Sequence, residues 1–124
     1  NVASGGMAER EVRGRAAAER AEAVGGSGEL DDAEVRRVIN QRMTAVRMCY
    51  ERQLRRNRQL QGRLNIQLTI GMSGSVSSAS AVQNTIGDPD VAACVVSVLR
   101  NAHFAAPSGG AVTISVPFVF SPSQ

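Results

Sequence analysis

Two cysteines and a single histidine are the side chains of this 124-residue chain with the widest chemical repertoire. The cysteines are Cys49 and Cys94, and His103 follows the second of them. A zinc site requires more ligands than these three residues supply. Three alternatives are therefore open: a disulfide, two buried free thiols, or a reactive cysteine paired with His103. The placement of the two cysteines in the predicted helices distinguishes between these three alternatives.

Patterns typical of enzymes do not occur in the sequence. There is no HExxH, GxSxG or Walker pattern, and no two acids share an apolar setting. Asp88 and Asp90 are explained as the cap and the first-turn charge of a helix. We therefore predict that the chain is not an enzyme and that it holds no metal and no cofactor.

Positive charge is concentrated in one region. All 14 basic residues are Arg, and residues 31–63 hold nine of them against four acids, whereas residues 1–30 and 64–124 each carry a net charge of −1. Such a region favours acidic partners such as nucleic acid, anionic lipid or cell-wall polymer. The alternative of a solvated helix face stays open. The candidate contacts for an acidic partner are Arg52, Arg55, Arg56, Arg58 and Arg63.

Composition divides the chain into three parts. Residues 1–30 are rich in Ala, Glu, Arg and Gly and carry no apolar stripe, so we predict a flexible linker there. Residues 31–122 are predicted to form one domain, and residues 123–124 a tail. The sequence has neither the run of about 18 apolar residues that a membrane span needs nor a signal-peptide pattern. We expect a fragment of a longer protein, with any membrane anchor outside it.

Helical periodicity predicts two helices. The first begins after a cap at Asp31 or Asp32 and ends near Asn57. Arg42 lies within its apolar stripe, where it either reaches water or pairs with a carboxylate. The second helix begins at Pro89. The stripes are Val35, Val38, Ile39, Met43, Val46, Cys49, Tyr50 and Leu54 on the first helix, and Val91, Cys94, Val95, Val98, Leu99 and Ala102 on the second.

A period of two predicts three strands. Residues 64–70 and 112–120 alternate clearly, whereas residues 75–83 are mostly small and would be explained by a bulge. The element order is helix, strand, strand, helix, strand. A right-handed crossover then gives a two-layer α+β sandwich. We predict a three-stranded sheet of order 2-1-3 with both helices on one face.

The predicted fold favours the disulfide. Cys49 and Cys94 lie at the edges of stripes on two helices that share one sheet face, which can bring them within bonding distance. Two free buried thiols stay open as the alternative. A disulfide would place the chain in an oxidising compartment and argues against nucleic acid as a partner.

The outer edge of the last strand is free in a sheet of order 2-1-3. An extended partner segment could add to its main-chain groups. Pro117 fits such an edge because its missing N–H has to point away from the neighbouring strand. Protection of the edge against aggregation is the alternative role of this proline. The predicted partner-strand edge consists of Thr113, Ser115, Pro117 and Val119.

A set of ordered marks runs through residues 31–122. They are Cys49-Tyr50-Glu51, Gly62, Gly74 with Val76, the run from Asp90 to Cys94, Phe104, Pro107, and the run from Pro117 to Phe120. With these marks the sequence resembles the AgmX/PglI-type C-terminal domain of myxobacterial gliding-motility proteins, which is itself similar to the C-terminal domain of TonB. Relatives often have Trp-Arg-Phe or Trp-Arg-Tyr where this chain has Ala102-His103-Phe104, so contacts of that Trp and Arg are not carried over.

The resemblance implies a TonB-like fold and a periplasmic place at the end of an inner-membrane-anchored, envelope-spanning protein. It also implies transfer of energy to an outer-membrane partner. We therefore expect a protein-binding module in energy transduction or gliding motility, which docks an extended segment of an outer-membrane or envelope protein on the last strand. The alternative is binding of cell-wall glycan or another acidic partner through the Arg-rich end of the first helix.

Overall fold

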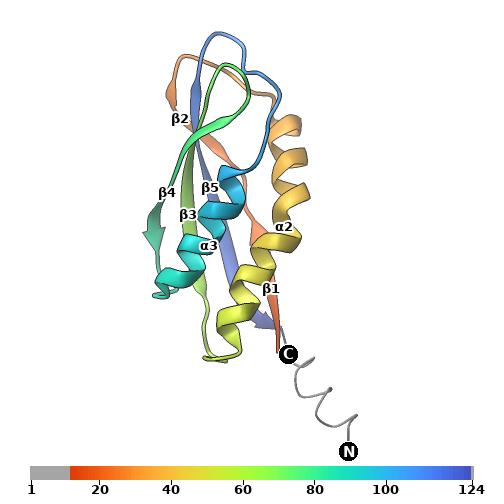
Figure 1. Cartoon of the computed structure of the whole chain (residues 1–124), viewed down its shortest axis with the longest axis vertical. Coiled ribbons are helices and arrows are strands. Elements are labelled where there is room, and N and C mark those ends of the chain that lie inside the picture. Colours follow the sequence, from red (N-terminus) through yellow and green to blue (C-terminus); the bar gives the residue numbers. More distant parts are fainter. Residues whose placement is uncertain (1–11, 124) are drawn as a thin grey trace, which may run out of the picture.

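One antiparallel sheet with two helices on one of its faces forms the part of the chain that the computed structural model describes, residues 12–123 (Figure 1). The sheet order is β1-β5-β3-β4, and β2 pairs with β5 beyond the end of β1. The elements are β1 (Arg13–Ala18), β2 (Glu22–Gly26), α2 (Asp32–Leu54), β3 (Gly62–Ile70), β4 (Val76–Asn84), α3 (Pro89–Arg100) and β5 (Val112–Ser123).

The prediction of an α+β fold is confirmed, but the prediction of a three-stranded sheet is wrong. The three predicted strands are β3, β4 and β5, and β3 lies between the other two. Two further strands, β1 and β2, cover the outer edge of β5. The sheet therefore has five strands.

Both added strands come from the segment predicted to be a flexible linker. That prediction is wrong for residues 13–18 and 22–26, and residues 1–11 lie outside the described part of the chain. The physical reason is that main-chain hydrogen bonds hold an edge strand, so it needs no continuous apolar stripe. The predicted tail is likewise part of β5 as far as Ser123.

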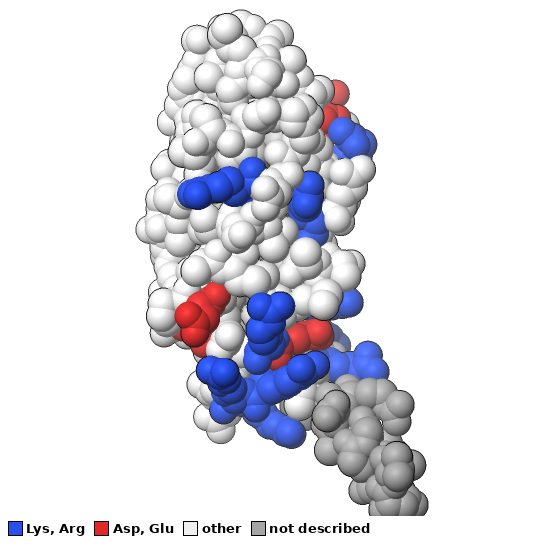
Figure 2. Space-filling model, viewed as in Figure 1, with Lys and Arg blue, Asp and Glu red and all other residues white. Residues whose placement is uncertain are grey.

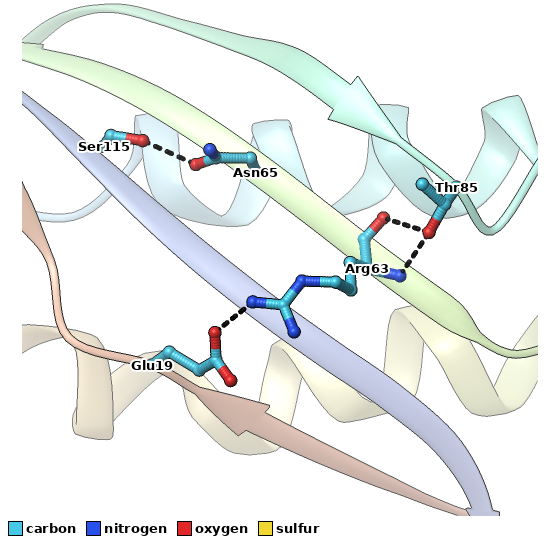
Figure 3. Close-up of polar contacts among 5 residues, drawn as sticks. All are labelled: Glu19, Arg63, Asn65, Thr85 and Ser115. Atoms are coloured by element: carbon cyan, nitrogen blue, oxygen red, sulfur yellow. Dashed lines mark hydrogen bonds and ion pairs between the residues drawn. The ribbon is translucent and has the colours of Figure 1, made fainter.

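The core lies between the helices and the inner face of the sheet. Alternate residues of β3 and β5 are buried against α2 and α3, as their period of two predicts. The other face of the sheet carries no helix; Asn65 and Ser115 lie half-buried on it, and Glu19 and Arg63 are exposed there (Figure 3). The largest fully buried side chains are Tyr50, Phe104, Phe118, Phe120, Leu54, Leu64, Ile66, Leu68, Ile70, Leu99, Val38 and Val46.

Polar side chains define where the helices begin. Asp31 Oδ1 accepts a hydrogen bond from the Ala33 N–H at 3.2 Å, and Asp88 Oδ1 accepts one from the Asp90 N–H at 2.8 Å. These are N-caps of the kind that the sequence predicts. The first helix ends at Leu54, earlier than expected. Within residues 12–123 Arg42 pairs with no carboxylate; it donates to the Asn101 carbonyl at 2.8 Å, beside the C-terminal end of α3.

The predicted disulfide is confirmed. Cys49 on α2 is bonded to Cys94 on α3, with the two Cα atoms 5.7 Å apart. Because the bond joins residues 45 positions apart, loop closure in the unfolded chain gives roughly 4 kcal/mol of stabilisation. The disulfide thus fixes the two helices to each other over the sheet.

Candidate functional site

The edge predicted to receive a partner strand is covered by the chain itself. Val119 is paired with Ala17 of β1, and Thr113 and Ser115 are paired with Gly25 and Glu22 of β2. The prediction of a free edge is therefore wrong for this structure. The edge has the predicted geometry, but the N-terminal segment supplies its neighbour.

Pro117 lies at the break between the two covering strands. Its carbonyl accepts a hydrogen bond from the Glu19 N–H at 2.8 Å, which shows that the odd-numbered residues of β5 direct their main-chain groups outward. Since Pro117 has no N–H to donate, β1 ends at Ala18 and β2 starts only at Glu22. A proline within this central strand thus divides its outer edge into two separate halves.

β1 is firmly attached over the half of the β5 edge that it covers. Gly14 is buried, and a side chain there would come within 2.4 Å of the Tyr50 ring. The Gly14 N–H donates to Glu51 Oε2 at 2.9 Å. Val12, Ala16 and Ala18 pack against the core. These contacts join β1 to α2 as well as to β5.

β2 is attached to its half of the β5 edge by little more than main-chain hydrogen bonds. Every residue of β2 is exposed, and its pairing with β5 contains an irregularity between Ala23 and Gly25. After β2 the chain is held again, because the Gly28 N–H donates to the Ala111 carbonyl at 2.9 Å and Glu29 forms a bridge with Ser108. Residues 22–25 are therefore a weakly held segment between two fixed points.

A cleft of about 580 Å³ lies between β2 and the N-terminal half of α2. Its floor is apolar, formed by alternate residues of β5 and by α2, and its rim is polar. Leu30 is the one large apolar side chain that residues 12–30 place in its lining, beside Ala18, Glu19, Arg20, Ala21 and Ala23, so β2 and its neighbours fill it poorly. Apolar residues of the lining include Ala21, Ala23, Val35, Ile39, Val112, Ile114 and Val116.

The helix-free face of the sheet holds a set of polar contacts (Figure 3). Ser115 Oγ donates to Asn65 Oδ1 at 2.6 Å, and the hydroxyls of Thr69 and Thr113 are 3.0 Å apart. The Arg63 guanidinium reaches across β5 to the Glu19 carboxylate. Arg63 is thus turned toward the helix-free face and paired there, away from the cluster at the end of α2 with which it was predicted to act.

Arginines gather instead around the C-terminal end of α2, at the lower end of the face in Figure 2. Arg52, Arg55, Arg56 and Arg58 are exposed there, as predicted for a solvated or partner-binding surface. Arg55 also lines a groove of about 770 Å³ between α2 and β1. We call it the Arg groove; it is lined by Arg13, Arg15, Arg47, Arg55, Glu51, Val12, Gly14, Ala16, Ala17 and Ser123.

Two of the arginines in this groove could not be found from the charge pattern. Arg13 and Arg15 come from a segment whose acids outnumber its basic residues, and only the pairing of β1 with β5 places their strand beside α2. The cleft lining at Ala21 and Ala23 was equally hidden, because alanines in a low-complexity segment give no signal of a binding surface.

Two acidic groups within residues 12–123 have a shifted pKa, and the hydrogen bond to Glu34 raises the pKa of Arg37. The pKa of Glu34 is lowered, first by the hydrogen bond from Arg37 and then by the bond that the Ala105 N–H donates. Burial raises the pKa of Tyr50 to about 12. Both groups hold parts of the fold together: Glu34 ties α2 to the loop before β5, and the Tyr50 hydroxyl donates to the Leu60 carbonyl.

No group of three or more potential metal ligands occurs within residues 12–123. None of the helices in that range is long and apolar enough to cross a membrane. Comparisons of the chain with protein-family models, curated protein sequences and solved structures find no match. The resemblance to AgmX/PglI-type and TonB C-terminal domains therefore stays a prediction.

Proposed function

We propose that the chain is a protein-binding module of the cell envelope, in which an extended partner segment takes the place of β2 on the outer edge of β5. The observation that carries the proposal is the cleft beside β2. From β2 the cleft lining contains a single residue, Ala23, which faces an apolar floor. A partner with larger side chains would bury surface that β2 leaves uncovered.

Main-chain geometry supports this choice of site. Removal of β2 frees the outward groups of Thr113 and Ser115, while β1 stays attached through Gly14 and keeps Val119 paired. Strand addition draws its affinity from such main-chain groups and its specificity from pockets for alternate side chains. In this structure the cleft supplies the pocket, since Ala23 of β2 pairs with Ile114 of the cleft floor.

The cellular setting rests on two supports. The disulfide between Cys49 and Cys94 favours an oxidising compartment. The resemblance to gliding-motility and TonB-type domains supplies the periplasm as that compartment, and an outer-membrane or envelope protein as the partner. The role in energy transduction or gliding motility is part of this proposal and follows from the resemblance alone.

Synthetic peptides with the sequence of residues 18–26 test the proposal without the natural partner. One peptide keeps the native sequence, and the other carries Ala21→Leu and Ala23→Leu. Each leucine adds three buried carbons, or about 2 kcal/mol at full burial, so the leucine peptide should bind roughly 100- to 1000-fold more tightly. The native peptide should fail to displace the tethered β2, which benefits from a high effective concentration. Calorimetry on the intact chain measures both.

A crosslinked variant supplies the control. A Cβ atom at Gly25 would lie 3.6 Å from Thr113 Cβ, within the range for a disulfide. The disulfide in the variant Gly25→Cys/Thr113→Cys should therefore hold β2 in place and abolish binding of the leucine peptide. The variant Gly25→Ser/Thr113→Ser, which forms no such crosslink, should still bind the peptide. Equal binding to the crosslinked variant would show that the peptide sits elsewhere, and the proposal would be wrong.

A further inference from the structure

We propose that the Arg groove binds an acidic peptide segment in extended form, which adds to the outer edge of β1. This surface is separate from the one occupied by β2, because it lies on the opposite side of β1 from β5. The inference therefore does not depend on displacement of β2. It rests on three features of the groove: its charge, its exposed strand edge, and the placement of arginines on both sides of that edge.

Among residues 12–123, the lining of the groove holds four arginines and one acid, Glu51, so its charge is positive. The carboxylate of Glu51 already accepts the Gly14 N–H at 2.9 Å and lies 3.9 Å from Arg47 Nε. Arg13 has an interaction of its own, whereas Arg15 and Arg55 make no ion pair among the contacts found within residues 12–123. Guanidinium groups bind carboxylates with two parallel hydrogen bonds, which gives such a surface a preference for acids.

The edge of β1 points into the groove. The Gly14 N–H donates to Glu51, away from β5. Main-chain groups alternate in an antiparallel ladder, so the N–H and C=O of Ala16, which also lines the groove, point the same way. An extended peptide can pair with the main-chain groups of Ala16, whereas the Gly14 N–H is already bonded to Glu51. Nucleic acid finds no stacking surface here, because Tyr50, Phe104, Phe118 and Phe120, all the aromatic residues of the chain, are buried.

Arginines stand on both sides of this edge. Arg15 is paired with Ser121 and so lies on the helix-free face of the sheet, whereas Arg47 and Arg55 belong to α2 on the other face. Side chains of a strand added to β1 would point alternately to the two faces. Every residue of an acidic run would then meet arginine on one face or the other. The groove thus fits consecutive acids better than isolated ones.

A capped oligoglutamate peptide is the probe, and the same peptide with glutamine at each position is its control. The intact chain should bind oligoglutamate at low salt at least about tenfold more tightly than oligoglutamine, because only the former forms charge-assisted pairs. The variant Arg15→Gln/Arg55→Gln should weaken that binding by about tenfold or more. Arg20→Gln/Arg36→Gln removes the same charge outside the groove and should change it by less than about twofold.

The strand edge is tested by amide exchange and by other anions. The Ala16 amide should gain protection when oligoglutamate is added; an unchanged Ala16 amide would show binding by charge alone and overturn strand addition. Vesicles of phosphatidylglycerol and single-stranded oligothymidylate serve as alternative ligands. If either binds through Arg15 and Arg55 more tightly than oligoglutamate does, the groove is a lipid or nucleic-acid surface and the proposal is wrong. Equal loss of binding in both arginine variants would also overturn it.

Discussion

Tyr50 connects the covering strand β1 to the rest of the fold. Its side chain is fully buried, its ring centroid lies 5.1 Å from that of Phe120, and its hydroxyl donates to the Leu60 carbonyl. Gly14 of β1 packs directly on the ring, where no larger residue fits. One aromatic side chain thus holds α2, β5 and β1 together. The attachment of β1, which both proposals require, depends on this contact.

The titration of Tyr50 makes the contact measurable. Burial raises its pKa to about 12, from 10.0 for an ordinary tyrosine. The folded state therefore keeps its proton when the unfolded state loses it, so the stabilisation is complete below pH 10 and is lost as the pH rises toward 12. Since the chain has one tyrosine, tyrosinate absorbance reports this group alone. Chemical unfolding should show stability falling over that range.

The variant Tyr50→Phe is the control for this loss. It should be less stable than the native chain at neutral pH, because the Leu60 carbonyl loses its donor. Its stability should then change less between pH 10 and pH 12 than that of the native chain. Tyrosinate that forms in the native chain at the ordinary pKa would show that Tyr50 is exposed and that β1 does not cover it.

At the scale of elements, β2 is the part of the sheet with the least support. Its neighbours on both sides are held by side-chain packing or by paired main-chain bonds, whereas its own residues are all exposed. Segments with few buried contacts open at a lower free energy than the rest of a fold. The poor filling of the cleft by Ala23 is the physical reason for this weakness.

Filling the cleft from within the chain should stabilise β2. Ala23→Leu places a larger side chain over Val112 and Ile114, and we expect about 1 to 2 kcal/mol of stabilisation from the added burial. Val24, which is 51% exposed, supplies the control: Val24→Leu should change stability by less than about 0.5 kcal/mol. Denaturant unfolding measures both. Destabilisation by Ala23→Leu would mean that the cleft is closed in solution.

The elements that sequence patterns predict well are those whose side chains decide the fold. α2, α3, β3 and β5 alternate or repeat with clear periods, and capping by Asp31 and Asp88 marks the helix starts. β4 carries small residues and register shifts, so only its approximate place could be predicted. β1 and β2 were missed because alanine, glycine and arginine have low strand propensity, and the pairing with β5 decides their structure.

The candidate site was predicted in part for the same reason. The outward direction of Thr113, Ser115, Pro117 and Val119 follows from strand alternation, and the structure shows it. The strands β1 and β2 cover that edge through long-range pairing with β5, which the local periodicity of the sequence does not predict. The Arg groove is a second such case, since it unites β1 with α2 across the fold.

In the molecule as a whole, the N-terminal segment completes the sheet with two strands that are held to different degrees. β1 is fixed by Gly14, Tyr50 and Glu51. β2 is exposed and borders an underfilled cleft, and we propose that a partner segment can replace it. The two proposed partner surfaces therefore lie on the two sides of one segment. The central claim is that β2 opens while β1 stays closed.

Amide exchange of the free chain tests this claim most directly. The amides of Thr113 and Ser115 lie under β2, whereas that of Val119 lies under β1, and all three point to the same edge of β5. We predict that Thr113 and Ser115 exchange at least about tenfold faster than Val119 after correction for intrinsic rates, because β2 opens locally. The Gly25→Cys/Thr113→Cys crosslink should slow Ser115 to the rate of Val119. If Thr113 and Ser115 in the native chain already exchange as slowly as Val119, β2 opens only on global unfolding, and the account is contradicted.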